Sequence, residues 1–126
     1  MRLLVTGSRD WIDYDRLAWM LDRLEATNRI EVIIHGAARG ADALADAWAR
    51  LHRIDVDPWP AQWTAYPVNE RWRAGHDRNR QMLDNTKPDL VVAFKVGFDW
   101  TLKRGGTENM VRIAKEAGVP TLVVGR

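Results

Sequence analysis

The sequence predicts an α/β fold in which helices cover both faces of a mostly parallel, five-stranded sheet. Short apolar runs of the kind that form buried strands recur along the 126 residues. Segments with the apolar spacing of helices separate these runs, and such alternation is typical of parallel sheets. Because connections between parallel strands are right-handed, this order predicts a doubly wound, Rossmann-like arrangement.

The strands are predicted from apolar runs that end at glycine, proline or charged residues. They cover residues 2–6, 30–34, 54–59, 90–94 and 120–124. Two longer connections interrupt the alternation. Residues 60–74 form a predicted loop rich in Trp, Pro and Arg, and residues 95–104 form a second loop.

Four helices are predicted between the strands. Asp13 is expected to cap the first helix, in which Leu17, Met20, Leu21 and Leu24 recur at helical spacing. The second helix is predicted over residues 41–53 and the third over residues 75–84. Thr107 is expected to cap the fourth helix, which ends at Gly118.

Composition limits the classes of protein that the chain can belong to. Its length predicts a single domain over residues 1–126. The sequence contains no cysteine and no apolar stretch of the length that a membrane span needs, so we expect a cytoplasmic protein. A net charge of +2 is far from that of a nucleic-acid-binding tail, and seven tryptophans favour a homo-oligomer.

The stretch from His35 to Asp42 joins a predicted strand to a predicted helix and reads HGAARGAD. Gly36 and Gly40 would let a ligand approach the backbone, because glycine has no side chain. The first N–H groups of the next helix have no partner within that helix and attract anions. Arg39 adds a permanent, forked positive charge. The spacing matches neither the dinucleotide-binding glycine pattern nor the P-loop.

Other glycine turns and basic residues are predicted at the same edge of the sheet, because ligands of such sheets bind beyond the carboxyl ends of the strands. The residues expected there are Gly7, Ser8, Arg9, His35, Gly36, Arg39, Gly40, Gly75, His76, Arg78, Asn79, Lys103, Arg104, Gly105, Gly106, Thr107 and Glu108. Several glycine turns on one rim favour a site for a phosphorylated ligand. A nucleotide would bind more tightly than phosphate, because its base can stack and its ribose can form hydrogen bonds.

Tryptophan side chains could supply the stacking surface. Trp11, Trp63 and Trp72 are the candidates for contact with a base, since they lie near the predicted strand ends. Trp19 and Trp48 lie on predicted helices, where ordinary packing is expected.

Taken together, these motifs resemble the SLOG superfamily, and most closely its small YspA-like members. The resemblance covers most of the chain, through Gly7-Ser8-Arg9 with Trp11, His35 to Asp42, Trp48, Pro60-Ala61-Gln62-Trp63, Ala74-Gly75, Arg78-Asn79, Met82-Leu83, Pro88-Asp89, Ala93-Phe94, and Gly105-Gly106-Thr107 with Met110. It implies a Rossmann-like fold that binds a nucleotide or a nucleotide-derived phosphorylated ligand, as a sensor or a nucleotide-processing module. The ligand contacts that it implies are Gly7, Ser8, Arg9, Gly36, Arg39, Gly40, Asp42, Arg78, Asn79, Gly105, Gly106 and Thr107.

The chain departs from the LOG-type members of that superfamily, which hydrolyse nucleoside monophosphates. Those members carry P-G-G-x-G-T-x-x-E, and the glutamate serves the hydrolysis. Here Met110 occupies that position, while Glu108 lies two residues earlier, about 200° around a helix. Phe94-Lys95-Val96-Gly97 replaces the usual Phe-Pro-Gly-Gly, and an insertion of residues 98–102 follows as a lid or an interface.

Hydrolysis of an N-glycosidic or phosphate bond in a nucleotide is one alternative function. Asp42 and Glu108 are the candidate catalytic residues, with His35 and His76 as the other acid–base groups near the rim. The structural alternatives are that Asp42 holds the first turn of the second helix and that His35 caps its strand.

Binding of single-stranded DNA is the other alternative, because the DNA-processing protein A family shares the superfamily. Basic residues alternate with aromatic ones in a pattern that can grip single strands. The residues concerned are Trp63, Tyr66, Arg71, Trp72, Arg73, His76, Arg78 and Arg80. A solvated arginine face is the structural alternative.

A resident metal is not predicted, because the three histidines show no ligand spacing and there is no cysteine. A Mg²⁺ ion bound together with a nucleotide is compatible with Asp10 and Asp42, which lie near the predicted phosphate site.

Overall fold

The computed structural model describes residues 1–125. Five strands form one sheet: β1 (Arg2–Gly7), β2 (Val32–His35), β3 (Asp55–Pro58), β4 (Leu90–Phe94) and β5 (Thr121–Val124). They lie in the order β3-β2-β1-β4-β5, and every pair is parallel. The predicted five-stranded, doubly wound sheet is confirmed. Because the strand order reverses between β1 and β4, the loops after these two strands diverge and open a crevice there.

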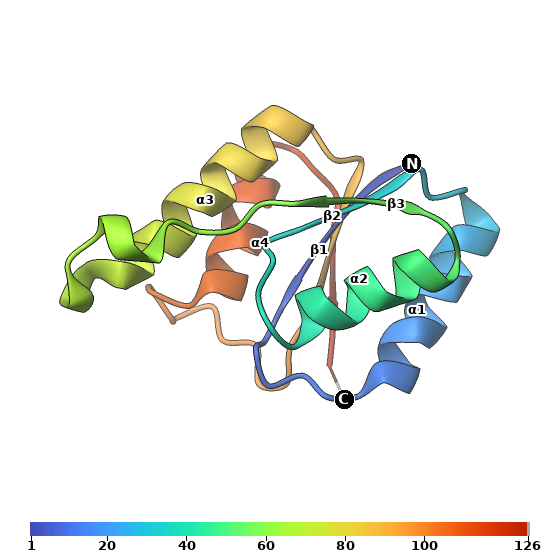
Figure 1. Ribbon diagram of the computed structural model, residues 1–126, viewed down its shortest axis with the longest axis horizontal. Coiled ribbons are helices and arrows are strands. Elements are labelled where there is room, and N and C mark those ends of the chain that lie inside the picture. The colour runs from blue at the N-terminus through green and yellow to red at the C-terminus, as the bar shows by residue number, and fades with distance from the viewer. Residues whose placement is uncertain (126) are drawn as a thin grey trace.

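Four helices cover the two faces of the sheet: α1 (Tyr14–Thr27), α2 (Ala41–Leu51), α3 (Arg71–Thr86) and α4 (Gly106–Glu116). Helices α1 and α2 pack on one face, and α3 and α4 pack on the other (Figure 1). Two short 3₁₀ turns, η1 (Trp63–Ala65) and η2 (Val68–Glu70), precede α3. In Figure 1 this green segment leaves β3 and extends to the far left, where α3 begins.

Several predicted boundaries move by a few residues. The Asp13 carboxylate accepts a hydrogen bond of 3.0 Å from the Arg16 N–H, which confirms the predicted cap of α1. The third helix begins at Arg71 and not at residue 75, because its first turn continues directly from η2. The predicted cap of α4 is wrong: Gly105 occupies that position, and Thr107 lies buried within the first turn.

The core consists of two layers of apolar side chains, one on each face of the sheet. Leu17, Leu21 and Trp48 bury the inner surfaces of α1 and α2 against one face. Met82 and Met110 bury the inner surfaces of α3 and α4 against the other. Among residues 1–125, none of the helices combines the length and the apolar character that crossing a membrane requires.

Tryptophan positions were only partly predicted. Trp48 is fully buried and donates a hydrogen bond of 3.0 Å from Nε1 to Asp22, as expected for a packing residue. Trp11 is also buried in the core against Phe94, so the expectation that it presents a stacking face is wrong. Trp19 is 51% exposed beneath the Arg23 guanidinium, and the expectation that it packs in the interior is wrong as well.

Candidate functional site

A pocket of about 350 Å³ opens beyond the carboxyl ends of β1 and β4, between the first turns of α3 and α4. It lies at the switch point of the sheet, where ligands of such folds bind. Eight of the twelve predicted contact residues line it, namely Gly7, Ser8, Arg9, Asp42, Arg78, Asn79, Gly106 and Thr107. The predicted convergence of loops at one edge of the sheet therefore occurs in the structure.

The remaining four predicted contact residues lie outside this pocket. Gly36 and Arg39 line a neighbouring hollow, which Arg9 also borders. Gly40 begins α2, and Gly105 begins α4. The single rim expected from the sequence is thus divided into two adjacent hollows, and Arg9 borders both.

The loop between β2 and α2 differs from the predicted anion cradle, because four of its N–H groups already have partners. The Asp42 Oδ2 atom accepts from the N–H groups of Gly36, at 3.0 Å, and Ala38, at 3.3 Å. The Ala37 N–H donates to Nδ1 of His35, and the Ala41 N–H donates to the Ser8 carbonyl. The loop is therefore held mainly by its own side chains, and these amides are not free to receive a phosphate.

The two glycines of this loop are required by the protein's own packing. A Cβ on Gly36 would collide with the Arg78 guanidinium. Gly40 has a φ of +79°, which disfavours other residues, and a Cβ there would collide with the Ser8 and Arg9 carbonyl groups. The expectation that these positions are open to a ligand is corrected accordingly.

Asp42 lies at the base of the pocket and is only 5% exposed. Burial raises the pKa of its carboxyl, although the two backbone N–H groups and the nearby His35 and Arg78 side chains oppose that shift. The Oδ1 atom is buried and has no hydrogen-bond partner in the described chain. Asp42 was expected to hold the first turn of α2, but its Oδ2 atom holds the loop before that helix instead, and Oδ1 accepts no hydrogen bond from the described chain.

His35 faces away from this pocket. Its Nε2 atom lies 2.7 Å from Asp46, while its Nδ1 atom accepts the Ala37 N–H. Because Nδ1 accepts a hydrogen bond, the proton that the ring donates toward Asp46 lies on Nε2. His35 therefore fixes the loop after β2, in agreement with the structural alternative.

Arg78 and Asn79 join the segments around the pocket. Arg78 donates from Nη1 to the carbonyl groups of Gly36 and Trp59, and from Nε to Oδ1 of Asn79, at 3.0 Å. The Asn79 amide donates to the Gly106 carbonyl at 3.0 Å. Together these side chains tie α3 to the β2–α2 loop and to the start of α4.

Two arginines at the pocket mouth lie over indole rings. The Arg9 guanidinium is 4.8 Å from the ring centroid of Trp63, and the Arg104 guanidinium is 4.7 Å from that of Trp72. Neither arginine forms an ion pair within residues 1–125. Both pairs line the pocket, so uncompensated positive charge and aromatic surface occur together there.

The first turn of α4 contributes backbone donors. The Asn109 N–H donates to the Gly105 carbonyl at 2.9 Å and begins the helical hydrogen bonding. The N–H groups of Gly106 and Thr107 precede that bond and have no partner within the helix. Because these two residues line the pocket, the positive end of the α4 dipole lies at its wall.

His76 lines the same wall, where its ring meets that of Trp72 edge to face at 5.2 Å. Burial lowers the pKa of its imidazole, and a hydrogen bond to the Arg104 backbone opposes the shift only in part. The neutral ring leaves Nε2 buried without a partner.

Comparison with known proteins assigns the chain to a family. A model of the YspA, cpYpsA-related SLOG family matches residues 1–66, which is just over half of the sequence. The chain belongs to this family. The Gene 61 protein of Mycobacterium phage D29 is 35% identical over 133 residues, which cover 98% of this chain and 96% of that protein.

Solved structures with the same fold are more distant from this SLOG family chain in sequence. DNA processing protein A of Streptococcus pneumoniae superposes with a TM-score of 0.70 at 17% identity, over 97% of this chain and 49% of that one. The UDP-GlcNAc 2-epimerase of Neisseria meningitidis, solved with UDP-GlcNAc bound, superposes with a TM-score of 0.61 at 18% identity. The superposition covers 98% of this chain and 32% of the epimerase chain. The chain spans about half of the first protein and about a third of the second. At these identities the likeness concerns the fold alone.

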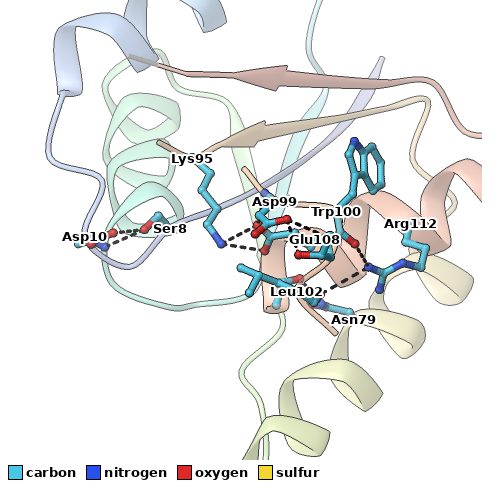
Figure 2. Close-up of polar contacts among 11 residues, drawn as sticks. Ser8, Asp10, Asn79, Lys95, Asp99, Trp100, Leu102, Glu108 and Arg112 are labelled. Carbon is cyan, nitrogen blue, oxygen red and sulfur yellow. Dashed lines mark hydrogen bonds and ion pairs between the residues drawn. The ribbon is translucent and has the colours of Figure 1, made fainter. Parts of the chain in front are cut away.

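Glu108 of this SLOG family chain is occupied by internal contacts. It is fully buried, and its two oxygens lie 2.8 and 2.7 Å from the Lys95 ammonium group, as Figure 2 shows. The Asp99 N–H also donates to it, at 3.1 Å. Glu108 does not line the pocket, and Met110 is buried in the core beneath α4.

The inserted segment after β4 is tied to α4 by the same cluster. Thr101 donates from its N–H and its hydroxyl to the Asp99 carboxylate. The Arg112 guanidinium donates to the carbonyl groups of Trp100, at 3.3 Å, and Leu102, at 3.5 Å (Figure 2). The insertion is thus anchored on α4, and none of residues 98–102 lines the pocket, whereas Lys95 before it and Arg104 after it do.

Lys95 is the charged residue of the pocket that was not predicted from the sequence. It follows β4 directly, so the rule that sites form at strand ends would have found it. Its ammonium group joins the rim of the pocket to buried Glu108, and its side chain is 19% exposed.

The basic and aromatic residues proposed to grip DNA differ in their surroundings. Arg78 is half-buried and engaged with backbone carbonyl groups, whereas Arg73 pairs with Glu70 at 3.4 Å. Arg71 and Arg80 are exposed and lie outside the pocket. Only Trp63, Trp72, His76 and Arg78 of that set line it.

Acidic groups near the pocket are dispersed. Asp10 is exposed and receives a hydrogen bond from the Ser8 hydroxyl, which lowers the pKa of its carboxyl. Within residues 1–125 no group of three or more metal-binding side chains comes together.

Proposed function

We propose that the protein binds a nucleotide or a nucleotide-derived phosphorylated ligand in the pocket at the β1–β4 switch point. The observation that carries the proposal is the combination of charge and ring surface at the pocket mouth. Arg9 and Arg104 carry positive charge that no described carboxylate neutralises, and each lies over an indole ring. A ligand with both an anionic group and a planar base matches this pair of features.

The first turn of α4 supports a phosphate at the same place. The N–H groups of Gly106 and Thr107 and the helix dipole favour an anion next to the two arginines. A charge-assisted hydrogen bond contributes roughly 1.5–3 kcal/mol, whereas association costs at least about 4 kcal/mol. Several such contacts together with base stacking are therefore needed for micromolar binding, which favours a nucleotide over inorganic phosphate.

The comparisons agree with a ligand of this class. Membership of the SLOG family suggests a nucleotide-like ligand. One structure with the same fold was solved with a nucleotide sugar bound to it. We propose that residues 1–126 act as one nucleotide-binding domain, in a sensor or a nucleotide-processing module.

Isothermal titration calorimetry tests the proposal directly. The folded protein is titrated with nucleoside 5′-monophosphates and diphosphates, ADP-ribose, UDP-GlcNAc and inorganic phosphate. We expect at least one nucleotide to bind in the micromolar range and inorganic phosphate to bind at least tenfold more weakly. Absence of heat with every member of the panel, for protein shown by circular dichroism to be folded, contradicts the proposal.

Substitution at the pocket mouth locates the binding. Arg104→Met removes a guanidinium that no ion pair engages, so we expect about a tenfold loss of nucleotide affinity. Arg80→Met is the matched control, because Arg80 is exposed on α3 and does not line the pocket. Equal affinities for the two variants would show that the nucleotide binds elsewhere.

A further inference from the structure

Buried polar atoms without a partner concentrate in the residues of this pocket. Four such side-chain atoms occur within residues 1–125: Asp42 Oδ1, Trp59 Nε1, Trp72 Nε1 and His76 Nε2. Asp42, Trp72 and His76 all line the pocket. Buried polar groups normally have hydrogen-bond partners, so a cluster of unpartnered groups indicates that something else completes them.

The Asp42 carboxylate is the most constrained of these groups. Its Oδ2 atom holds the N–H groups of Gly36 and Ala38, and this pair of contacts fixes the orientation of the carboxyl group. Oδ1 is therefore held in a fixed position on a side chain that lines the pocket and is 5% exposed. This buried acceptor has no donor within the described chain.

Neighbouring side chains do not supply that donor. Arg78 is close enough for its charge to act on Asp42, but its Nη1 and Nε groups donate to Gly36, Trp59 and Asn79. Arg9 also lies close enough for its charge to act on Arg78. These two positive charges disfavour a cationic donor at Oδ1, and the carboxylate itself disfavours a phosphate there. A neutral donor remains, and a hydroxyl group is the simplest one that a phosphate ester carries.

We propose that Asp42 accepts a hydrogen bond from a sugar hydroxyl of the ligand, so that the pocket selects nucleotides with free ribose hydroxyls. This inference rests on the proposed function. In this arrangement the phosphate lies at Arg104 and the first turn of α4, and the nucleobase lies against Trp63 and Trp72. The sugar, which joins the phosphate to the nucleobase, then faces Asp42. Asp42 thereby acts as a specificity-determining residue.

Calorimetry with matched nucleotides tests this inference. The four nucleoside 5′-monophosphates are compared with their 2′,3′-dideoxy counterparts, which carry the same phosphate and the same base. Removing a hydroxyl that donates to a charged, buried acceptor leaves the acceptor unpaired, so we expect a loss of affinity of about ten- to a hundredfold. This comparison uses the unaltered protein and does not depend on the folding of any variant.

An isosteric variant then assigns the effect to Asp42. Asp42→Asn keeps an acceptor for Gly36 and Ala38 but removes the charge, so the ratio of ribose to dideoxyribose affinities should fall to less than threefold. Asp84→Asn is the matched control, because Asp84 is exposed on α3 and lies outside the pocket, and it should keep the ratio of the unaltered protein.

Failure of this inference is distinguishable from failure of the proposed function. If ribonucleotides and dideoxynucleotides bind equally well, the inference is overturned while nucleotide binding stands. If the ratio persists in Asp42→Asn, another group recognises the hydroxyl and the inference is overturned. If no nucleotide binds, both are overturned.

Discussion

Asp42 divides its two carboxylate oxygens between the fold and the pocket. One oxygen accepts the two N–H groups that shape the β2–α2 loop, and the other is buried without a partner at the base of the pocket. The same residue therefore combines a structural contact with a buried oxygen that accepts no hydrogen bond from the described chain. An aspartate at the start of a helix is common, and only the surrounding structure shows which of its oxygens is engaged.

The structural task can be measured separately. Asp42→Ala leaves the buried Gly36 N–H without an acceptor, whereas Asp42→Asn retains one. Because an unpaired buried donor costs about 1–3 kcal/mol, we expect the alanine variant to be less stable than the asparagine variant by that amount. Urea denaturation of the two variants measures this difference, and equal free energies of unfolding would contradict the assigned contact.

The buried carboxyl also predicts a pH dependence. Burial raises the pKa of Asp42 in the folded protein, so the folded state retains this proton to a higher pH than the unfolded chain does. The stability that this group contributes is complete below its unfolded pKa of about 3.9 and is lost as the pH rises through the folded value. Asp42→Asn lacks this loss, so its stability relative to the unaltered protein should increase from about pH 4 upward and then level off. Urea denaturation across that pH range checks this, and a relative stability that falls with pH would reverse the assigned shift.

Residue identities near the strand ends were predicted better than residue contacts. Glycine turns and arginines could be recognised in the sequence, because their local pattern is visible there. Their partners are set by tertiary packing: Arg78 fills the space beside Gly36, and the β2–α2 amides bond to Asp42 and His35. The sequence alone cannot show which donors are already engaged.

At the scale of elements, the first turn of α4 connects the inserted segment to the pocket. Glu108 is buried beneath the insertion and is neutralised by Lys95, while Gly106 and Thr107 in the same turn line the pocket. Substitution of a residue in this turn therefore affects the support of the insertion as well as the site.

Removal of one partner of this ion pair should be costly. Lys95→Met leaves the Glu108 carboxylate buried without a countercharge, and we expect a loss of about 3 kcal/mol in stability. The double variant Lys95→Met with Glu108→Gln should recover most of that loss, because it removes both charges. Urea denaturation of the single and double variants measures both values. A single variant as stable as the unaltered protein would show that the pair contributes little.

Helix α3 shows why boundaries were harder to predict than the existence of elements. Its first turn contains Trp72 and arginines among loop-like proline and tryptophan residues, so the local composition favoured a start at residue 75. The 3₁₀ turn η2 leads directly into Arg71 and extends the helix by four residues. That extension carries Trp72 to the pocket, which a shorter helix would not do.

At the scale of the whole molecule, the order of the strands positions the site. Apolar runs alternating with helical segments were sufficient to predict a five-stranded parallel sheet, because few arrangements satisfy right-handed connections. The chain diverges on either side of β1 and β4, and the pocket that the arginines and indoles line lies there. The division into a main pocket and a second hollow beside Arg39 depends on side-chain packing and could not be predicted.

Nuclear magnetic resonance titration with a nucleoside 5′-monophosphate tests nucleotide binding in this pocket most directly. The backbone amides of Ser8, Gly106 and Thr107 and the indole N–H signals of Trp63 and Trp72 should shift together as the nucleotide is added. The indole signals of Trp19, Trp48 and Trp100 serve as internal controls, because these side chains lie outside the pocket, and they should stay unchanged. Shifts confined to other parts of the molecule, or no shifts at millimolar nucleotide, would contradict the account.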